Sequence, residues 1–387
     1  MTLMLATTTN QSPFFGVCSF SKGTTAKIPT PPAAATYFDM DFSPDGTMLV
    51  LGGASNIQVR NTSDWTDVSL TTGMVGAGAY VSFSPDGTTL ACMQASGTQP
   101  YLRIFRTSDW GAISIPSNVT SAGYGVKFSP DGKLLAVAHA SAPFLTVYDT
   151  ADWSKKTLSG GNPPGAVKDI AFSHDSKYLA CACDSASPRL VIYDTTDWSK
   201  KTGVPTPPSA ARTVAFSQDG AFLAVGVFSS PYLMVYRTSD WGTVSITGGG
   251  PTGQPNKLSF SKGGHLAVAH QTAPFLTIYD SSTWGMLQIP ATLTYSPTVP
   301  CAVFNHASPL IVRGSVRDVD NNPAARTVRI YERSTGELCA TTTSNPVTGD
   351  YSVKVYEGDV DYDAQFLAAP GELLNDLFFA RVRAGAP

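Results

Sequence analysis

A five-residue pattern, Phe-Ser-Pro-Asp-Gly, returns along most of the chain at nearly constant spacing. The pattern or a degraded form of it begins at Phe42, Phe83, Phe128, Phe172, Phe216 and Phe260, and a seventh, worn copy begins at Phe304. The intervals between these phenylalanines are 41, 45, 44, 44, 44 and 44 residues. Each of six units also contains one tryptophan: Trp65, Trp110, Trp153, Trp198, Trp241 and Trp284. Such a unit is one supersecondary element that buries its apolar faces against its neighbours, so the repeat decides the fold.

Each unit predicts four short antiparallel strands. In the third unit the strands are residues 125–128, 134–138 and 144–148, followed by a strand that begins at Trp153. In the Ser-Pro-Asp-Gly turn, proline presets φ, aspartate can bond its own backbone and glycine accepts a positive φ. A recurrent aspartate just before the tryptophan is expected to serve the second turn in the same way. Four strands in about 44 residues are typical of one propeller blade.

Both ends of the repeat region carry an incomplete unit. Residues 301–304 supply a first strand without a tryptophan-bearing continuation, while residues 3–6, 14–18 and 23–28 resemble the second, third and fourth strands. We therefore expect an all-β fold in which residues 1–309 form a seven-bladed β-propeller. Its closing blade would be assembled from both ends of the repeat region, which leaves no free sheet edge in the ring.

The units resemble WD40-like repeats over about four fifths of the chain. Phe-Ser-Pro-Asp-Gly followed by Leu-Ala is typical of that family, as in residues 128–136 with Leu135-Ala136. The Gly-His and Trp-Asp signatures of the family are absent, since here the order is Asp-Trp. The resemblance implies the four-stranded blade but not the family's usual hydrogen-bond network.

The sequence changes character at about Leu310. All four glutamates follow this point, and four segments alternate between apolar and polar residues: 311–316, 327–331, 338–342 and 351–356. Alternation at period two predicts strands. Residues 310–387 resemble the transthyretin-like, carboxypeptidase-regulatory-like β-sandwich, and residues 374–382 resemble the ending of similar domains at the C-termini of tailed-bacteriophage structural proteins.

Charge and hydropathy exclude several classes of partner. Only 14% of the residues are charged, the net charge is −3 and the pI is near 5.9. These values give no electrostatic case for nucleic acid or an anionic membrane surface. No apolar run reaches the ~20 residues of a membrane span. The N-terminus lacks the basic region of a signal peptide, so we expect synthesis in the host cytoplasm without membrane insertion.

The six cysteines do not suggest a disulfide scaffold. Cys92, Cys181 and Cys183 replace ordinary strand residues of the repeat, which favours buried, reduced thiols. Cys181 and Cys183 could be read as a metal or redox pair, but the sequence offers no further ligands for such a site.

Catalytic groups are scarce where a propeller places its binding loops. The loops between the second and third strands, and between successive blades, are rich in Pro, Gly, Ser and Thr and nearly uncharged. His139 and His270 occupy one repeat position in two of these units, and a metal shared between them is the weaker reading. We expect no enzyme activity, no metal and no cofactor, because a hydrolytic or metal-dependent propeller needs several convergent acidic or imidazole groups.

Aromatic residues near the loops are candidates for ligand stacking. Tyr80, Tyr124 and Tyr295 lie close to the connections between blades, where they could stack on sugars or pack between blades. Together with His139 and His270 they make up the candidate interaction face.

The favoured function is a non-enzymatic virion structural protein of a tailed phage or prophage, in the tail, a fibre, the collar or the capsid surface. Its propeller would be a protein–protein interaction platform for other virion proteins. Three alternatives stay open: a receptor- or glycan-binding module for a host surface, a cellular WD40-like scaffold, and, last, a propeller hydrolase or lactonase.

Overall fold

The computed structural model describes residues 4–8, 15–19, 25–26, 37–53, 57–68, 79–97, 99–184, 187–287, 301–304, 310–315, 327–332, 338–355, 361–367 and 380–383. Contacts divide the chain into two units. One comprises Leu5–Cys18 and Thr25–His306, and the other comprises Met1–Met4, Ser19–Thr24 and Ala307–Pro387. The described segments are strands and turns, and none of them is a helix of the length and apolarity that crossing a bilayer requires.

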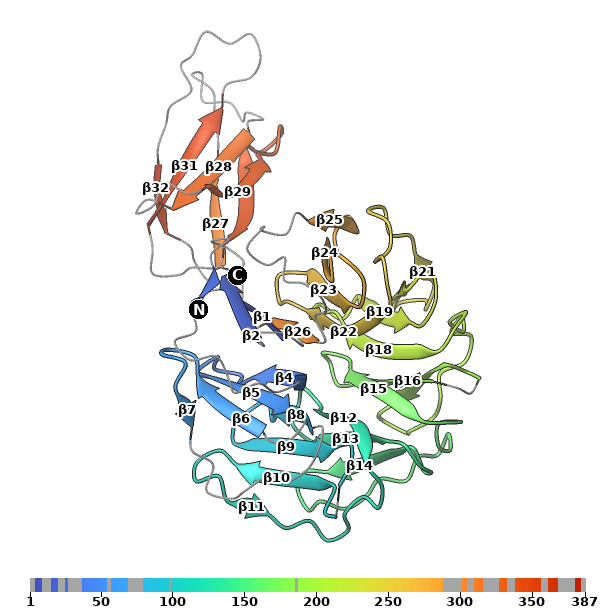
Figure 1. Ribbon diagram of the computed structural model, residues 1–387. Coiled ribbons are helices and arrows are strands. Elements are labelled where there is room, and N and C mark those ends of the chain that lie inside the picture. The colour runs from blue at the N-terminus through green and yellow to red at the C-terminus, as the bar shows by residue number, and fades with distance from the viewer. Residues whose placement is uncertain are drawn as a thin grey trace. The chain divides into compact units, whose positions relative to one another are not determined.

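Six consecutive repeats each form one antiparallel sheet, and these six blades surround a common centre (Figure 1). Blade one contains β4 (Tyr37–Phe42), β5 (Met48–Gly53), β6 (Ile57–Asn61) and β7 (Asp67–Val68). Blade two contains β8 (Ala79–Phe83), β9 (Thr89–Gln94), β10 (Leu102–Arg106) and β11 (Ala112–Ile113). Blade three contains β12 (Gly123–Phe128), β13 (Leu134–His139) and β14 (Leu145–Asp149).

Blades four to six repeat this order. Blade four contains β15 (Val167–Phe172), β16 (Tyr178–Cys183) and β17 (Leu190–Asp194). Blade five contains β18 (Ala211–Phe216), β19 (Phe222–Val227), β20 (Leu233–Arg237) and β21 (Thr243–Val244). Blade six contains β22 (Pro255–Phe260), β23 (His265–His270), β24 (Leu276–Asp280) and β25 (Gly285–Leu287). In blades three and four the outer strand is reduced to one bridge, Tyr148 with Lys155 and Tyr193 with Lys200.

The second strand of each blade is buried along nearly its whole length. In β13 all residues after Leu134 are buried, and β16, β19 and β23 show the same pattern. These strands read as continuous apolar runs because both faces of the sheet are covered by neighbouring blades. The β-propeller fold expected from the repeat is confirmed.

The Ser-Pro-Asp-Gly turn has the predicted geometry. In blade one the Ser43 hydroxyl donates to Asp45 at 2.6 Å, and Asp45 Oδ1 accepts the Thr47 N–H at 3.0 Å. Gly46 has a φ of 70°, in the left-handed region that glycine enters without a steric penalty. The Ser43 hydroxyl also accepts the N–H of Met48, so side chains of the turn satisfy its backbone N–H groups.

The repeat predicts that the fourth strand begins at the tryptophan, but the structure shows that it does not. The tryptophan ends the turn before that strand, and all six tryptophans have φ between 55° and 61°. The preceding aspartate accepts the N–H of the residue that follows tryptophan, as Asp64 does from Thr66 at 3.0 Å. In blade six the Thr283 hydroxyl accepts the equivalent bond from Gly285, so the replacement of aspartate keeps the turn. The expectation failed because period-two patterning does not detect one left-handed residue.

The tryptophans and a recurrent tyrosine join adjacent blades. Trp198 of blade four packs with Ala136 and Val147 of blade three, and Trp284 meets Phe222 of blade five edge-on at 5.1 Å. The Tyr236 hydroxyl of blade five donates to the carbonyl of Pro205, in the connection from blade four, at 3.0 Å. Equivalent bonds join Tyr148 to Ser117, Tyr193 to Gly161 and Tyr279 to Gly249.

A seventh sheet unites the two ends of the repeat region. Its order is β26 (Cys301–Phe304), β1 (Met4–Thr8), β2 (Phe15–Ser19) and β3 (Thr25–Ala26). The register pairs Leu5 with Phe304 and Thr8 with Cys301. β26 also contacts β22 and β4, the first strands of blades six and one. Six blades are therefore built from consecutive repeats, whereas the side chains of this terminal sheet lie outside the described residues.

The other unit contains two antiparallel sheets. One pairs β27 (Leu310–Ser315) with β30 (Asp350–Val355). The other has the order β29 (Leu338–Thr343), β28 (Thr327–Glu332), β31 (Asp361–Leu367) and β32 (Ala380–Arg383). Val328 and Ile330 on β28 and Tyr351 on β30 are buried, and β29 contacts β30. Residues 374–379 of the phage-like ending lie outside the described part.

Candidate functional site

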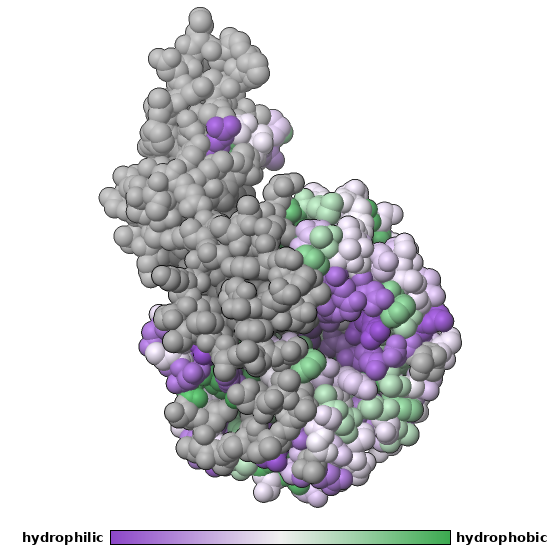
Figure 2. All heavy atoms as spheres, in the orientation of Figure 1, coloured by the Kyte–Doolittle hydropathy of each residue, from purple (hydrophilic) through white to green (hydrophobic). Residues whose placement is uncertain are grey.

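The first strands of the blades surround a central channel with a cavity at each end. The loop-side cavity, of about 380 Å³, lies near the connections between blades, and the turn-side cavity, of about 390 Å³, lies near the Ser-Pro-Asp-Gly turns. Asp169 and Lys257 line both cavities. In the view of Figure 2, hydrophilic residues gather around the centre of the propeller, with hydrophobic patches beside them. The channel therefore contains charged side chains among apolar lining residues.

A buried ion cluster spans this channel. The Lys257 ammonium of blade six lies 3.1 Å from Oδ1 of Asp39 in blade one and 3.6 Å from Oδ1 of Asp169 in blade four. The Asp39 side chain is 1% exposed and that of Lys257 is 14% exposed. Burial acts to raise the pKa of Asp39, but the ammonium groups of Lys257 and Lys127 outweigh it and hold that pKa below its usual value.

The carboxylates of Asp39 and Asp169, together with that of Asp41, bond the inner edges of neighbouring strands. Asp39 Oδ2 accepts the Val81 N–H of blade two at 3.2 Å, and Asp41 Oδ2 accepts the Phe83 N–H at 2.9 Å. Asp169 Oδ2 accepts both the Val214 N–H at 3.2 Å and the Thr213 hydroxyl at 2.7 Å. Since the first strand is the innermost of its blade, these bonds satisfy amides that no further strand pairs.

Aromatic, amide and basic side chains meet in the loop-side cavity. Its described lining is Phe38, Tyr80, Tyr124, Lys168, Asp169, Arg212, Gln254, Pro255, Asn256, Lys257 and Gln271. The Lys168 ammonium lies 3.9 Å from the centre of the Tyr124 ring and 3.3 Å from Asp184 Oδ2. Phe38 is 41% exposed, while burial raises the pKa of Tyr80. The structure thus brings together Tyr80 and Tyr124, two of the predicted site residues.

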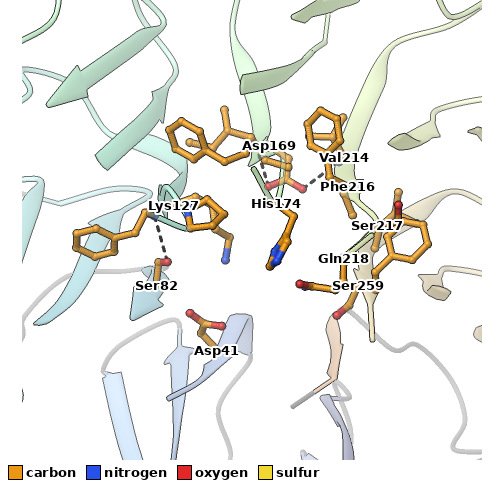
Figure 3. A pocket seen from close by; sticks show the side chains of 18 of the residues that line it. Asp41, Ser82, Lys127, Asp169, His174, Val214, Phe216, Ser217, Gln218 and Ser259 are labelled. Carbon is orange, nitrogen blue, oxygen red and sulfur yellow. Dashed lines mark hydrogen bonds between the residues drawn. The ribbon is translucent and has the colours of Figure 1, made fainter. Parts of the chain in front are cut away.

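The turn-side cavity has two chemically different halves. The second residue of the turn is Pro44, Pro85 and Pro130 in blades one to three, but His174, Gln218 and Lys262 in blades four to six. Figure 3 shows Asp41, Lys127 and His174 around the middle of this cavity. The dashed bonds of Asp169 and Ser82 in that view show these two side chains committed to backbone amides.

His139 and His270 do not present their side chains on an interaction face. Both are buried, and Nε2 of each bonds a threonine hydroxyl of the adjacent strand: Thr146 at 3.0 Å for His139 and Thr277 at 2.9 Å for His270. Burial lowers the pKa of His139, and lowers that of His270 to about 4. The repeat pattern places both histidines at the start of a loop. In the structure each is the last residue of the second strand of its blade.

The remaining candidates are resolved more simply. Tyr295 lies outside the described residues. Cys92, Cys181 and Cys183 are free and buried, as expected, and burial raises the pKa of Cys183 to about 12. In the described part of the chain, no group of three or more His, Cys, Asp or Glu side chains is placed to hold a metal ion.

The charged residues of the channel were missed from the sequence. A propeller usually binds ligands through its loops, whereas these charged residues lie on first strands: Asp39, Lys168, Asp169, Arg212 and Lys257. A detectable signal existed: Asp39, Asp169 and Lys257 all stand three residues before the repeat phenylalanine, a position where a strand would otherwise be apolar or neutral. These residues come from different blades, so their pairing depends on how the blades are arranged around the centre. No local sequence pattern predicts that arrangement.

Comparisons with known proteins agree with this architecture. Residues 153–191 match the family described as WD domain, G-beta repeat. A solved structure of Kuenenia stuttgartiensis hydrazine synthase is similar at 20% identity, with a TM-score of 0.53, over 67% of this chain and 80% of that chain. At this identity the similarity concerns the fold alone. Comparison with curated proteins gives no match. The chain therefore carries a WD40-type repeat within a β-propeller.

Proposed function

We propose that the protein is a non-enzymatic interaction protein whose propeller is a rigid platform. The observation that carries this proposal is the structural commitment of its buried titratable groups. Asp39 and Asp169 pair with Lys257 and hold backbone amides, and His139 and His270 bond threonines inside their blades. Groups engaged in this way are poorly placed to exchange protons with a substrate. The surfaces left for function are the loops and the two cavities.

Closure of the ring supports the platform role. We take the sheet of β26, β1, β2 and β3 as a seventh blade, because β26 contacts the first strands of blades six and one. A ring that is closed by pairing its two ends has no free edge and resists opening. We also take the two C-terminal sheets, with Val328, Ile330 and Tyr351 buried, as a transthyretin-like sandwich over residues 310–387 that acts as a docking module.

The biological setting that we propose is the virion of a tailed phage or prophage, with other virion proteins as partners. Its support is the resemblance of residues 374–382 to the ending of phage structural domains. Mass spectrometry of purified particles tests it, using a host that carries the encoding phage or prophage. We expect peptides from both units at a fixed copy number relative to the major capsid protein, and their absence from intact particles would refute a virion role.

Recognition of a receptor or glycan by the loop side of the propeller is the second candidate. The specific observation in its favour is the cavity that contains Phe38, Tyr80 and Tyr124 beside amide and basic groups. A glycan array with the parent protein, Phe38→Ala and Tyr124→Ala tests it. Both variants should lose signal on the same glycans, and unchanged binding would argue against this role.

A further inference from the structure

The loop-side cavity offers the two kinds of contact that sugars use. Phe38 is exposed and presents apolar ring surface, on which the C–H face of a pyranose can stack, and Tyr124 lines the same cavity with the Lys168 ammonium over its ring. Gln254, Asn256 and Gln271 supply amide donors and acceptors for hydroxyl groups, and the Gln271 amide reaches Asn256 Oδ1 at 3.0 Å. A volume of about 380 Å³ falls within the range of small-ligand pockets.

Arg212 differs from the other cations of the cavity. Lys168 pairs with Asp184 and Lys257 pairs with Asp39, at 3.3 and 3.1 Å respectively. Arg212 has no carboxylate partner within the described part of the chain; its guanidinium lies 5.2 Å from the centre of the exposed Phe228 ring. An arginine held by stacking keeps its planar fork of donors for a carboxylate, which it can bind through two parallel hydrogen bonds.

We infer that the loop-side cavity binds a saccharide that carries a carboxylate, with Arg212 as the anion-binding residue. The inference rests on the proposed recognition role and adds the class of ligand. Among the described lining residues the basic side chains outnumber the one carboxylate, that of Asp169, which already pairs with Lys257. An acidic sugar would therefore add the missing partner of Arg212 while its ring occupies the aromatic wall.

The test compares matched acidic and neutral sugars. The methyl glycosides of glucuronic, galacturonic and N-acetylneuraminic acid are titrated into the full-length protein, followed by saturation-transfer NMR and calorimetry. The neutral partners are the methyl glycosides of glucose and galactose and the methyl ester of the sialoside. We expect at least one acid to bind about tenfold or more tightly than its neutral partner.

Two arginine variants assign the effect to the cavity. Arg212→Gln should remove the preference for the acid, while Arg237→Gln should keep it, because Arg237 lies on the same blade but pairs with Asp240 at 3.0 Å. A thermal melt and circular dichroism spectrum of each variant establish that it is folded. A preference that survives Arg212→Gln, or is lost equally in Arg237→Gln, would overturn the assignment.

The remaining outcomes separate this inference from the role on which it rests. Equal binding of acidic and neutral sugars would overturn the carboxylate inference and leave glycan recognition standing. If sulfated sugars bind as tightly as the carboxylated sugars, the site is not selective for a carboxylate, and that part of the inference is overturned. Failure of every saccharide to bind the folded parent would overturn both the inference and glycan recognition, whereas the virion proposal is decided by particle composition.

Discussion

The Lys257 ammonium lies 3.1 Å from Asp39 Oδ1, so an ion pair joins blades six and one inside the propeller, 218 positions apart in sequence. Lys257 also reaches Asp169 of blade four. Buried ion pairs add little over a well-packed apolar replacement, but removing one partner leaves an uncompensated charge. The pair therefore makes the stability of the ring sensitive to single substitutions at its centre.

Lys257→Met should destabilise the protein by about 3 kcal/mol at pH 7, because Asp39 is left buried without its main cation. Urea unfolding measures the change. Lys257→Met combined with Asp39→Asn should recover much of the loss, since the amide oxygen can still accept the Val81 N–H. Lys177→Met is the matched control: its pair with Asp175 is exposed, so it should change stability by less than about 1 kcal/mol.

The pH dependence of the same variant has a definite sign. In the parent, the pKa of Asp39 is lowered in the folded state, so its contribution is present above the pKa of an unfolded aspartate, about 4, and is lost as the pH falls through the folded value. In Lys257→Met, burial is no longer offset by Lys257, and protonation of Asp39 should relieve the cost. The stability difference between parent and variant should therefore shrink at low pH, and a constant difference would contradict the role of the pair.

The sequence predicted the blade in detail because each blade is a local object. The turn residues Ser43, Asp45 and Gly46 act within a few positions of one another, so the sequence alone predicts the turn that they form. Trp153 was misplaced by the pattern because a φ of 59° is a property of one residue that periodicity averages out. Turn chemistry is thus encoded locally, while an isolated left-handed residue is not.

The centre of the propeller was less predictable than its blades. Asp39, Asp169 and Lys257 come from three blades, and their mutual distances follow from ring closure and not from any local pattern. Tyr80 and Tyr124 could be placed near the connections between blades because they stand three and four residues before the repeat phenylalanine, at the start of the first strand. His139 and His270 were predicted near the loops, but their side chains are buried. A residue at the end of a buried strand can point into its blade, as these two do in bonding Thr146 and Thr277.

His270 should make stability fall as the pH falls through the mildly acidic range. Its folded pKa of about 4 lies below the value near 6.5 of an unfolded histidine, so the unfolded chain binds the proton first. The contribution of the neutral imidazole is complete above about pH 6.5 and is lost between pH 6.5 and 4. We expect a loss of about 2 kcal/mol over this interval from urea unfolding at several pH values.

His270→Gln isolates this contribution. The variant should be less stable than the parent at pH 7.5, because the bond to Thr277 is altered, but its stability should change less between pH 6.5 and 4.5. His174→Gln makes the same substitution at an exposed position in a turn and is the matched control for the loss of an imidazole. An unchanged pH profile in His270→Gln would show that the imidazole does not titrate as burial requires.

Tyr236→Phe should cost about 1 kcal/mol, because it removes the hydroxyl that bonds the Pro205 carbonyl and keeps the ring. Burial raises the pKa of Tyr236 to about 12, so the effect should not vary between pH 6 and 9. Thermal and urea unfolding measure it. Tyr232→Phe is the control on the same blade, since the hydroxyl of this half-buried tyrosine makes no hydrogen bond to the described residues. An equal loss of stability in both variants would show that the bond from Tyr236 to Pro205 does not stabilise the contact between blades.

The register of the terminal sheet allows a one-substitution test of the proposed seventh blade. Thr8 on β1 pairs with Cys301 on β26, whereas the adjacent Thr7 pairs with Ala302. Directly paired residues on antiparallel strands have Cβ atoms about 4.5–5.5 Å apart, so a disulfide, which needs about 3.5–4.5 Å, requires only a small shift of the strands. Thr8→Cys should therefore form a disulfide with Cys301 under mild oxidation and link the two ends of the repeat region.

Thr7→Cys is the matched control, because the register pairs position 7 with Ala302 and not with Cys301. Peptide mass spectrometry after oxidation should identify a disulfide between position 8 and Cys301 in Thr8→Cys, and no corresponding link in Thr7→Cys. The link closes a long loop, so it should also raise the urea midpoint of the oxidised protein above that of the reduced protein. If Thr8→Cys stays reduced, or both variants crosslink equally, the pairing of Thr8 with Cys301 and the proposed seventh blade are refuted, because only the stated register brings position 8 against Cys301.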